Sequence, residues 1–271
     1  MSAVFPCALP ASALRAVAAL ILFQLVPAPA WRIQAQAAEP GLPAFARQLI
    51  VAVAEGWDSP RAVLTCWERS RARDPWRPVL FKETVPVLLG SGGMAWGLGV
   101  ATSNDPSARF KKEGDQRAPA GCFQIGRVFG YAAAAPEGCA VPYRQVTRWD
   151  AWIDDADHPL YNRHYVAHPS VVPDWFEKHR MRLGDFAYEW MIEIRHNADP
   201  PRPGFGSAIF FHIRRGPNRP SHGCTTMRKE DLLSLIRWID ARKSPHYVLL
   251  PRETYRHRVE PWSLPSLPAE D

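Results

Sequence analysis

A cysteine follows a Ser-His-Gly turn in the stretch RPSHGCTTM, at residues 219–227. A thiol between a glycine and two threonines has few apolar neighbours along the chain, so this position favours chemistry over packing in a core. A free thiol has a pKa of about 8.5 and is mostly protonated at neutral pH, so Cys224 needs a base within reach to act as a nucleophile. The sequence offers one such base.

His212 is the candidate base, twelve positions before Cys224 at the end of the alternating stretch SAIFFHI. The alternation predicts a strand with Phe211 on one face and His212 on the other. The following IRRGPNRPSHG is rich in Gly, Pro and Asn and predicts a loop that returns to the cysteine. The N–H groups of Gly223 and Cys224 would then face a developing oxyanion. A core histidine without a catalytic role is the alternative for His212 taken alone.

Alternating apolar residues predict strands over much of the chain. The runs 49–54 and 62–68, separated by a Gly/Asp/Ser/Pro turn, predict a hairpin. AYEWMIEIRHN and HYVLL predict further strands, whereas KEDLLSLIRWIDARK has helical spacing with acids first and bases last. We therefore predict a mainly β fold, a β-rich sandwich or barrel with a few short helices, as one domain over residues 45–256. Residues 257–271 are expected to form a C-terminal tail.

The first 37 residues predict an export signal. Arg15 precedes the uncharged run 16–26, and small-x-small cleavage sites end near residues 30 and 37. Eleven residues are fewer than the ~20 that span a bilayer as a helix, so a cleaved peptide is favoured over an uncleaved anchor. We therefore expect an exported protein of the periplasm or cell envelope, with no transmembrane anchor after cleavage.

Four cysteines remain beyond this segment: Cys66, Cys122, Cys139 and Cys224. In an oxidising compartment two disulfides are the simplest expectation. A nucleophilic thiol must stay reduced, so we predict instead a disulfide between Cys122 and Cys139 and a free Cys224. Two buried thiols at these positions are the alternative.

Charge and metal-ligand spacing exclude other classes. The net charge of +6 is not organised as a run of Lys and Arg interleaved with aromatics, so we predict no nucleic-acid partner. His164 and His168 are four residues apart but lack the glutamate of a zinc-binding helix. The DDAD run at 154–157 lacks the glycine and closing glutamate of a calcium loop. We therefore predict no metal site.

The stretch IFFHIRRGPNRPSHGCTTM resembles the active-site segment of the L,D-transpeptidases, the YkuD-type catalytic domain, whose signature is a His, a loop and then [S/T]-H-G-C. KKEGDQRAPAGCFQIG resembles the family's charged segment leading into Pro-x-Gly-x-Phe. IDDADHPLYN and PGFGSAIFFHI resemble blocks of one bacterial branch, so the resemblance covers roughly residues 45–251. The run Thr225-Thr226-Met227 departs from the usual hydrophobic residue followed by Asn or Arg.

The resemblance implies a β-rich catalytic fold and a reaction on peptidoglycan stem peptides, without metal or organic cofactor. It implies Cys224 as the nucleophile, His212 as its base and His222 as the second motif histidine, with Ser221 and Gly223 completing the motif. Basic residues are candidates for holding stem carboxylates, with a solvated basic face as the alternative: Arg109, Lys111, Lys112, Arg214 and Arg215. We expect a monomer.

Three function classes follow. The favoured one is an L,D-transpeptidase, in which Cys224 attacks the amide between a diamino acid and a D-amino acid and passes the thioester to an amine, giving a 3→3 cross-link or attachment to a protein. The second is an L,D-carboxypeptidase or cross-link-cleaving hydrolase on the same scaffold. The third is a catalytically inactive wall-binding or metal-binding protein.

Overall fold

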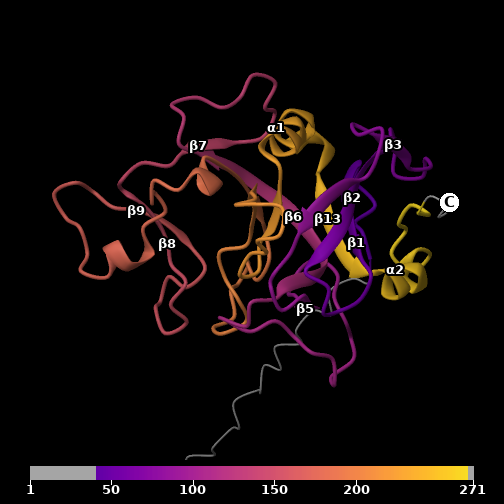
Figure 1. Ribbon diagram of the computed structural model, residues 1–271, viewed down its shortest axis with the longest axis horizontal. Helices are drawn as coiled ribbons and strands as arrows, with labels where there is room; N and C mark the ends of the chain where they lie inside the picture. Colours follow the sequence, from indigo (N-terminus) through magenta and orange to yellow (C-terminus); the bar gives the residue numbers. More distant parts are fainter. Residues whose placement is uncertain (1–40, 268–271) are drawn as a thin grey trace, which may run out of the picture. The chain divides into compact units, whose positions relative to one another are not determined.

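Eight strands close into a barrel in the part of the chain that the structure, a computed structural model, describes, residues 41–267. Their order around the ring is β1-β13-β6-β10-β11-β12-β4-β2, and β2 pairs back with β1. Figure 1 shows β2, β1, β13 and β6 of this ring side by side. Ring closure leaves none of these eight strands with an unpaired edge. The mainly β, barrel-like prediction is confirmed. The segment 1–37, predicted as an export signal, lies outside the described residues.

The strands are β1 (Gln48–Ala54), β2 (Arg61–Glu68), β3 (Arg77–Val79), β4 (Val85–Leu88), β5 (Met94–Trp96), β6 (Ala118–Gly130), β7 (Tyr143–Gln145), β8 (Asp150–Trp152), β9 (His164–Val166), β10 (Trp190–Ile194), β11 (Phe210–Ile213), β12 (Thr225–Met227) and β13 (His246–Pro251). The helices are α1 (Lys229–Trp238), α2 (Arg252–Arg258) and the short 3-10 turns η1 (Phe176–His179), η2 (Phe186–Tyr188) and η3 (Ala241–Lys243). The predicted hairpin is β1–β2, the predicted helix is α1, and the predicted strands appear as β10, β11 and β13.

The alternation in β11 separates two hydrophobic clusters. Phe211 and Ile213 belong to the main core, together with the buried face of α1. Phe210 belongs to a second cluster on the other face of the strand, with Phe129 of β6 and Met191 of β10. The strand wall between β6 and β11 is therefore buried on both faces, and the second face carries His212.

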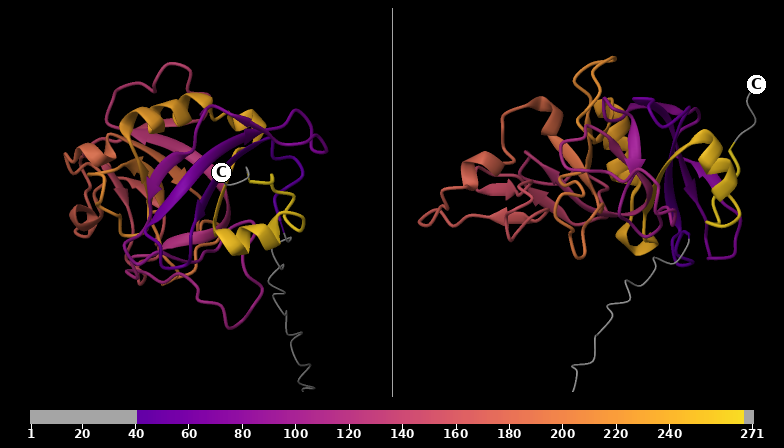
Figure 2. Two further views of the ribbon diagram at one scale, coloured as in Figure 1. Left: turned by 45° about the vertical axis from the view of Figure 1, so that its right-hand side comes forward. Right: turned by 90° about the horizontal axis from the view of Figure 1, so that it is seen from below.

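A long excursion between β6 and β10, residues 131–189, covers that second face. It contains β7 and the separate two-stranded sheet β8–β9, which Figures 1 and 2 show to one side of β1, β2 and β13. Asp150 of β8 is fully buried and is bonded by Arg144 (2.8 Å) and His164 (2.9 Å). Val146 and Met181 from this excursion complete the second cluster. The excursion is thereby fastened to the barrel.

The C-terminal segment packs on the barrel beyond the predicted domain boundary. Trp262 and Leu264, within the segment expected to be a tail, are buried in the main core. The Trp262 carbonyl accepts from the Leu42 N–H (3.2 Å), which joins the two ends of the described residues. Among residues 41–267 no helix has both the length and the hydrophobicity needed to cross a membrane.

The predicted Cys122–Cys139 disulfide is wrong, because both thiols are free. Cys122 lies near the start of β6, opposite Val248 of β13, and is completely buried. Cys139 follows the far end of the same strand, and its Sγ contacts the Val141 carbonyl at 3.5 Å. The chain after β6 turns back along the strand, since β7 pairs with β6 in parallel with Val128 opposite Tyr143, and Cys139 lies half-buried in the loop before β7, outside the β6–β13 ladder that encloses Cys122.

Candidate active site

Strands β11 and β12 bring the imidazole of His212 and the thiol of Cys224 to one face of the barrel wall. The two strands are parallel, with His212 opposite Thr226, and Cys224 immediately precedes β12. Phe210, two residues before His212, points to the same face, and the thiol packs with it in the second cluster. The register therefore puts the two side chains on the same face of the wall.

The thiol of Cys224 is held by backbone groups of the chain leading into β11. The Phe210 N–H donates to Sγ at 3.4 Å, and Sγ donates to the Ala208 carbonyl at 3.5 Å. Ala208 has a φ of 53°, a left-handed conformation that a residue with a Cβ adopts at a cost. The loop before β11 is thus shaped around the sulfur atom.

Asn162, from the excursion, fixes that loop. Its Oδ1 accepts from the Ala208 N–H (3.1 Å), and its Nδ2 donates to the carbonyls of His196 (3.0 Å) and Asn197 (2.7 Å). Sequence reasoning did not assign Asn162 a role, although it is the last residue of the IDDADHPLYN block on which the family resemblance partly rested. A side chain 62 positions away in the chain therefore orders the surroundings of Cys224.

His212 is a buried, neutral histidine. Its ring is 2% exposed, its Nδ1 donates to the Ile213 carbonyl (3.0 Å), and it packs against the Tyr188 ring at 5.0 Å between centroids. Burial lowers the pKa of His212 to about 4, against the opposing effect of the Ile213 and Ala187 carbonyls. The imidazole is therefore uncharged at neutral pH and able to accept a proton.

The Cys224 thiol is protonated in the resting structure. Burial raises its pKa to about 11, while the Phe210 N–H and the charges of Lys111 and Arg215 act to lower it. The thiol and the imidazole lie on one face but in separate hydrogen bonds, the thiol with Ala208 and the ring with Ile213. The resting pair is consequently thiol and imidazole rather than thiolate and imidazolium.

The Ser-His-Gly turn is closed by its own serine. Ser221 Oγ accepts from the Gly223 N–H (3.0 Å) and donates to the Cys224 carbonyl (2.6 Å). Gly223 has a φ of 146°, and a Cβ there would lie 2.9 Å from the Arg117 carbonyl, so the position requires glycine. Because the Gly223 N–H is used inside the turn, it does not face the site as expected; the Cys224 N–H is not a donor in the turn's hydrogen bonds. His222 is exposed.

A protein-family model described as the L,D-transpeptidase catalytic domain (YkuD) matches residues 82–248, a span that includes His212 and Cys224. The chain belongs to the L,D-transpeptidase catalytic domain family. No curated protein and no solved structure matches it in the corresponding searches. The family resemblance inferred from the motif is confirmed.

Two of the basic residues predicted to bind substrate lie beside the thiol of this L,D-transpeptidase domain. The Lys111 side chain is 3% exposed, and Nζ is bonded to Asp115 at 2.8 Å and lies 3.4 Å from where a Gly223 Cβ would be. Arg215 donates to Asp185 Oδ2 through Nε (3.0 Å) and covers the Tyr188 ring. Both cations act on the thiol's pKa, so they form the electropositive surroundings of Cys224.

The other three basic residues are not among the charges that act on the pKa of the thiol. Lys112 is exposed, and its N–H bonds to Asp115 (2.8 Å). Arg214 continues the β11–β12 ladder through its N–H to the Met227 carbonyl (2.8 Å). Arg109 lies 3.5 Å from Asp58, in a pocket described below. No sequence pattern distinguishes Lys111 from Lys112, because only the fold decides which side chain turns inward.

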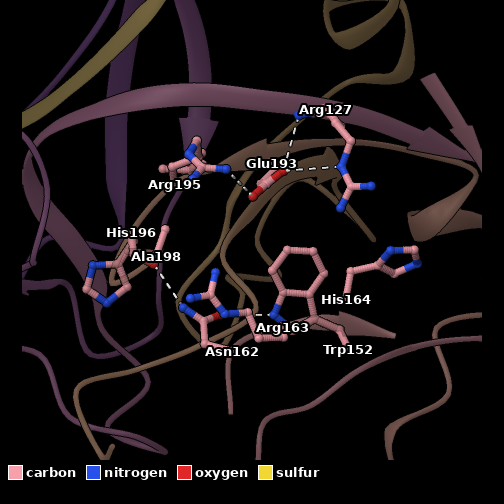
Figure 3. Close-up of a pocket in the computed structure, with 10 residues that line it drawn as sticks. Arg127, Trp152, Asn162, Arg163, His164, Glu193, Arg195, His196 and Ala198 are labelled. Atoms are coloured by element: carbon pink, nitrogen blue, oxygen red, sulfur yellow. Dashed lines mark hydrogen bonds and ion pairs between the residues drawn. The ribbon is translucent and has the colours of Figure 1, made fainter. Parts of the chain in front are cut away.

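A small pocket of about 150 Å³ lies on the same face of the L,D-transpeptidase domain, where the excursion meets β6 and β10. Figure 3 shows Glu193 between Arg127 and Arg195, above the Trp152 indole. Glu193 Oε2 accepts from the Arg127 N–H (3.2 Å), and the Trp152 Nε1 donates to Asn162 (2.9 Å). The charges are largely paired, so we interpret this pocket as an ion-pair network that anchors the excursion.

The histidines considered for a metal are engaged in structure. His164 Nε2 lies 2.9 Å from Asp150 Oδ1 and links β9 to β8, while His168 is exposed. Within residues 41–267, no group of three or more His, Cys, Asp or Glu side chains is arranged to hold a metal ion.

Proposed function

We propose that this protein is a peptidoglycan L,D-transpeptidase that uses Cys224 as its nucleophile. The observation that supports this most directly is the position of an uncharged His212 and a free Cys224 on one face of adjacent strands. The substrate would be a tetrapeptide stem, cleaved between the diamino acid and the terminal D-amino acid. The same assignment gives Ser221 and Gly223 the role of shaping the turn.

The first half-reaction breaks the amide of the donor stem. His212 accepts the thiol proton as Sγ forms a bond to the amide carbon, and the carbonyl oxygen becomes an oxyanion. The C–N bond then breaks, the proton passes from His212 to the departing nitrogen, and a D-amino acid leaves behind a thioester at Cys224. Because the pKa of His212 is about 4 and that of Cys224 about 11, a preformed ion pair is unfavourable, so proton transfer accompanies attack.

Groups on the turn would stabilise the negative charge that develops on the carbonyl oxygen in this step. We assign the Cys224 N–H as the oxyanion donor, since the Gly223 N–H is bonded to Ser221. Lys111 adds a positive charge beside Gly223, and its Asp115 partner keeps it in place. We assign His222, which is exposed, to the acceptor side rather than to the thiol.

The second half-reaction decides between transferase and hydrolase. The amine of a second stem, or of a protein, attacks the thioester, the S–C bond breaks, and the amine proton returns to the thiol by way of His212. Water competes with the amine, and an enzyme favours the amine only by holding it in attacking geometry. We assign the holding of the amine to the loop 214–220, which contains two prolines and three arginines.

The decisive experiment is to incubate the mature protein with muropeptides that carry tetrapeptide stems and to follow the products by mass. Dimers joined through two diamino acids support transfer. Tripeptides alone, at every acceptor concentration, identify an L,D-carboxypeptidase. A mature protein that turns over no stem, with an unmodified Cys224, identifies a binding protein.

Export belongs to the same proposal. Peptidoglycan lies outside the cytoplasmic membrane, so the enzyme must be exported to the periplasm or cell envelope, with residues 1–37 as the signal and the catalytic domain at 45–256. Intact-mass measurement of the protein from the envelope fraction will show whether the mature chain begins after residue 30 or 37. Size-exclusion chromatography tests the expected monomer.

A further inference from the structure

A larger pocket, with a volume of about 570 Å³, lies away from Cys224 and is not used by the proposed mechanism. Its floor is made by Trp57 from the β1–β2 turn and by Met94 and Trp96 of β5. Its rim includes Asp58 and Arg109. We name it the indole pocket. Its volume lies in the range of about 300–1,000 Å³ that is typical of sites for small organic ligands.

The two indoles of this pocket are held in place from behind. Their ring centroids are 5.1 Å apart, and Trp96 makes an edge contact with the buried Trp262 at 6.4 Å. The Trp57 carbonyl accepts from the Met94 N–H at 2.7 Å, which fixes the turn against β5. Half-buried Trp57 therefore presents an aromatic surface at little entropic cost to a ligand that packs on it.

The polar rim is balanced in charge. The pocket is lined by two carboxylates and two guanidinium groups, from Asp58, Asp105, Arg109 and Arg258. Asp58 is 75% exposed and Arg109 is 64% exposed, and they lie 3.5 Å apart, so both retain free hydrogen-bonding positions. Balanced charge argues against an anion. A saccharide is a neutral ligand that fits both parts of the pocket. Its apolar faces can pack on the indoles, and its hydroxyl groups can form hydrogen bonds with the rim.

Arg117 connects this pocket with the turn that carries Cys224. Its carbonyl lies 2.9 Å from where a Gly223 Cβ would be, and its guanidinium bonds to Asp58 (2.8 Å) and to the Met94 carbonyl (3.0 Å). The rim of the pocket is thus one arginine side chain away from the turn. Three extended stem residues, from the cleaved bond back to the sugar, reach at most about 10 Å.

We propose that the indole pocket binds the saccharide of the donor strand while its stem peptide reaches Cys224. This inference rests on the proposed function, since it takes the substrate to be a glycan-linked stem. It makes the enzyme selective for stems that are still attached to sugar. The free peptide would lack the contacts with this pocket.

The test compares two donors with the full mature chain: a free tetrapeptide and the same tetrapeptide on its disaccharide. We expect Trp57→Ala to lower kcat/KM for the disaccharide donor about tenfold and to change that for the free peptide less than about twofold. Arg109→Ala, an exposed change that leaves the indoles in place, should act in the same direction. Trp76→Ala is the matched control, since Trp76 is another half-buried tryptophan, bonded to the Ser263 carbonyl at 2.9 Å.

A binding measurement separates this inference from the proposed function. The Cys224→Ala protein should bind the disaccharide without peptide, measured by calorimetry, and Trp57→Ala in that background should abolish the heat. If the wild type turns over neither donor, the proposed function fails while the saccharide titration still decides the pocket. Equal losses on both donors, or no saturable binding of the disaccharide, overturn the inference.

Discussion

The barrel core and the Ser-His-Gly turn each contain cysteine, and the groups that act on the pKa of the thiol differ between the two regions. Cys66 and Cys122 lie in the core, where burial raises the pKa of both thiols far above the usual range and nothing acts against it. Cys224 is also shielded, but an N–H donor, Lys111 and Arg215 oppose the rise in its pKa. Burial alone makes a thiol inert; burial with opposing cations and a nearby base makes one that can react.

The backbone explains why the regions differ. Cys66 and Cys122 are interior positions of long strands, so the residues before and after each of them are paired with a neighbouring strand. Cys224 stands one residue before a three-residue strand, at the end of a turn that a serine side chain closes. Its side chain and N–H therefore remain on the surface of the wall that the excursion covers.

The largest expected effect comes from removing the reactive thiol. In chains that also carry Cys139→Ser, which removes the other free, half-buried thiol, Cys224→Ala should abolish adduct formation with a stem substrate or a thiol-alkylating reagent under native conditions, measured by intact mass. Cys122→Ala is the control and should leave the adduct on Cys224 intact, since that thiol is completely buried. An adduct that persists on the Cys224→Ala chain would show that the comparison between the two regions is mistaken.

The next effect is that of the base. His212→Ala should lower the alkylation rate of Cys224 near neutral pH by about 10²–10⁴-fold, because the thiol then loses its proton acceptor. His222→Ala should cost much less, since that side chain is exposed and has no part in the wall. Quenching the alkylation at successive times and mapping the peptides gives both rates. A larger loss from His222→Ala would reverse the two roles.

A smaller effect is expected at Asn162, which orders the loop around the sulfur. Asn162→Asp keeps an acceptor for the Ala208 N–H but loses the two donors to the His196 and Asn197 carbonyls. The free energy of unfolding should fall by about 1–3 kcal/mol, and turnover of stems should fall about tenfold as the loop loosens. Urea melts and steady-state kinetics measure the two. Asn218→Asp, at an exposed position in the loop 214–220, is the control.

The last prediction concerns the pH dependence of stability, which reports on burial rather than on turnover. Burial lowers the pKa of His212 to about 4 and that of His196 to about 3, whereas both titrate near 6.5 in the unfolded chain. Between about pH 4 and 6.5 the unfolded state binds more protons, so the free energy of unfolding rises with pH, by up to ~1.4 kcal/mol per pH unit for each histidine. Urea melts from pH 4.5 to 7.5 should show the slope. His212→Gln should reduce it, and His222→Gln should leave it unchanged.

Much of the local structure follows from short patterns in the sequence. The β1–β2 hairpin, the two faces of β11 and the amphipathic α1 were predictable because strand alternation and helical spacing depend on neighbours a few residues apart. The pairing of His212 with Cys224 on one face was predictable for the same reason, since one loop joins them. The motif of a histidine, a loop and Ser-His-Gly-Cys was by itself enough to indicate the family.

Other features depended on contacts between distant parts of the chain. Ring closure through β1 and β2, the inward turn of Lys111 instead of Lys112, and the clamp of Asn162 on Ala208 have no local signature. The Cys122–Cys139 prediction failed because Cys122 is enclosed between β6 and β13, whereas Cys139 lies in the loop before β7, and nearness in sequence does not decide which side chains meet. The pKa values of His212 and Cys224 also depend on distant parts of the chain. Both shifts come from burial by the excursion, which the residues adjacent to them in sequence do not determine.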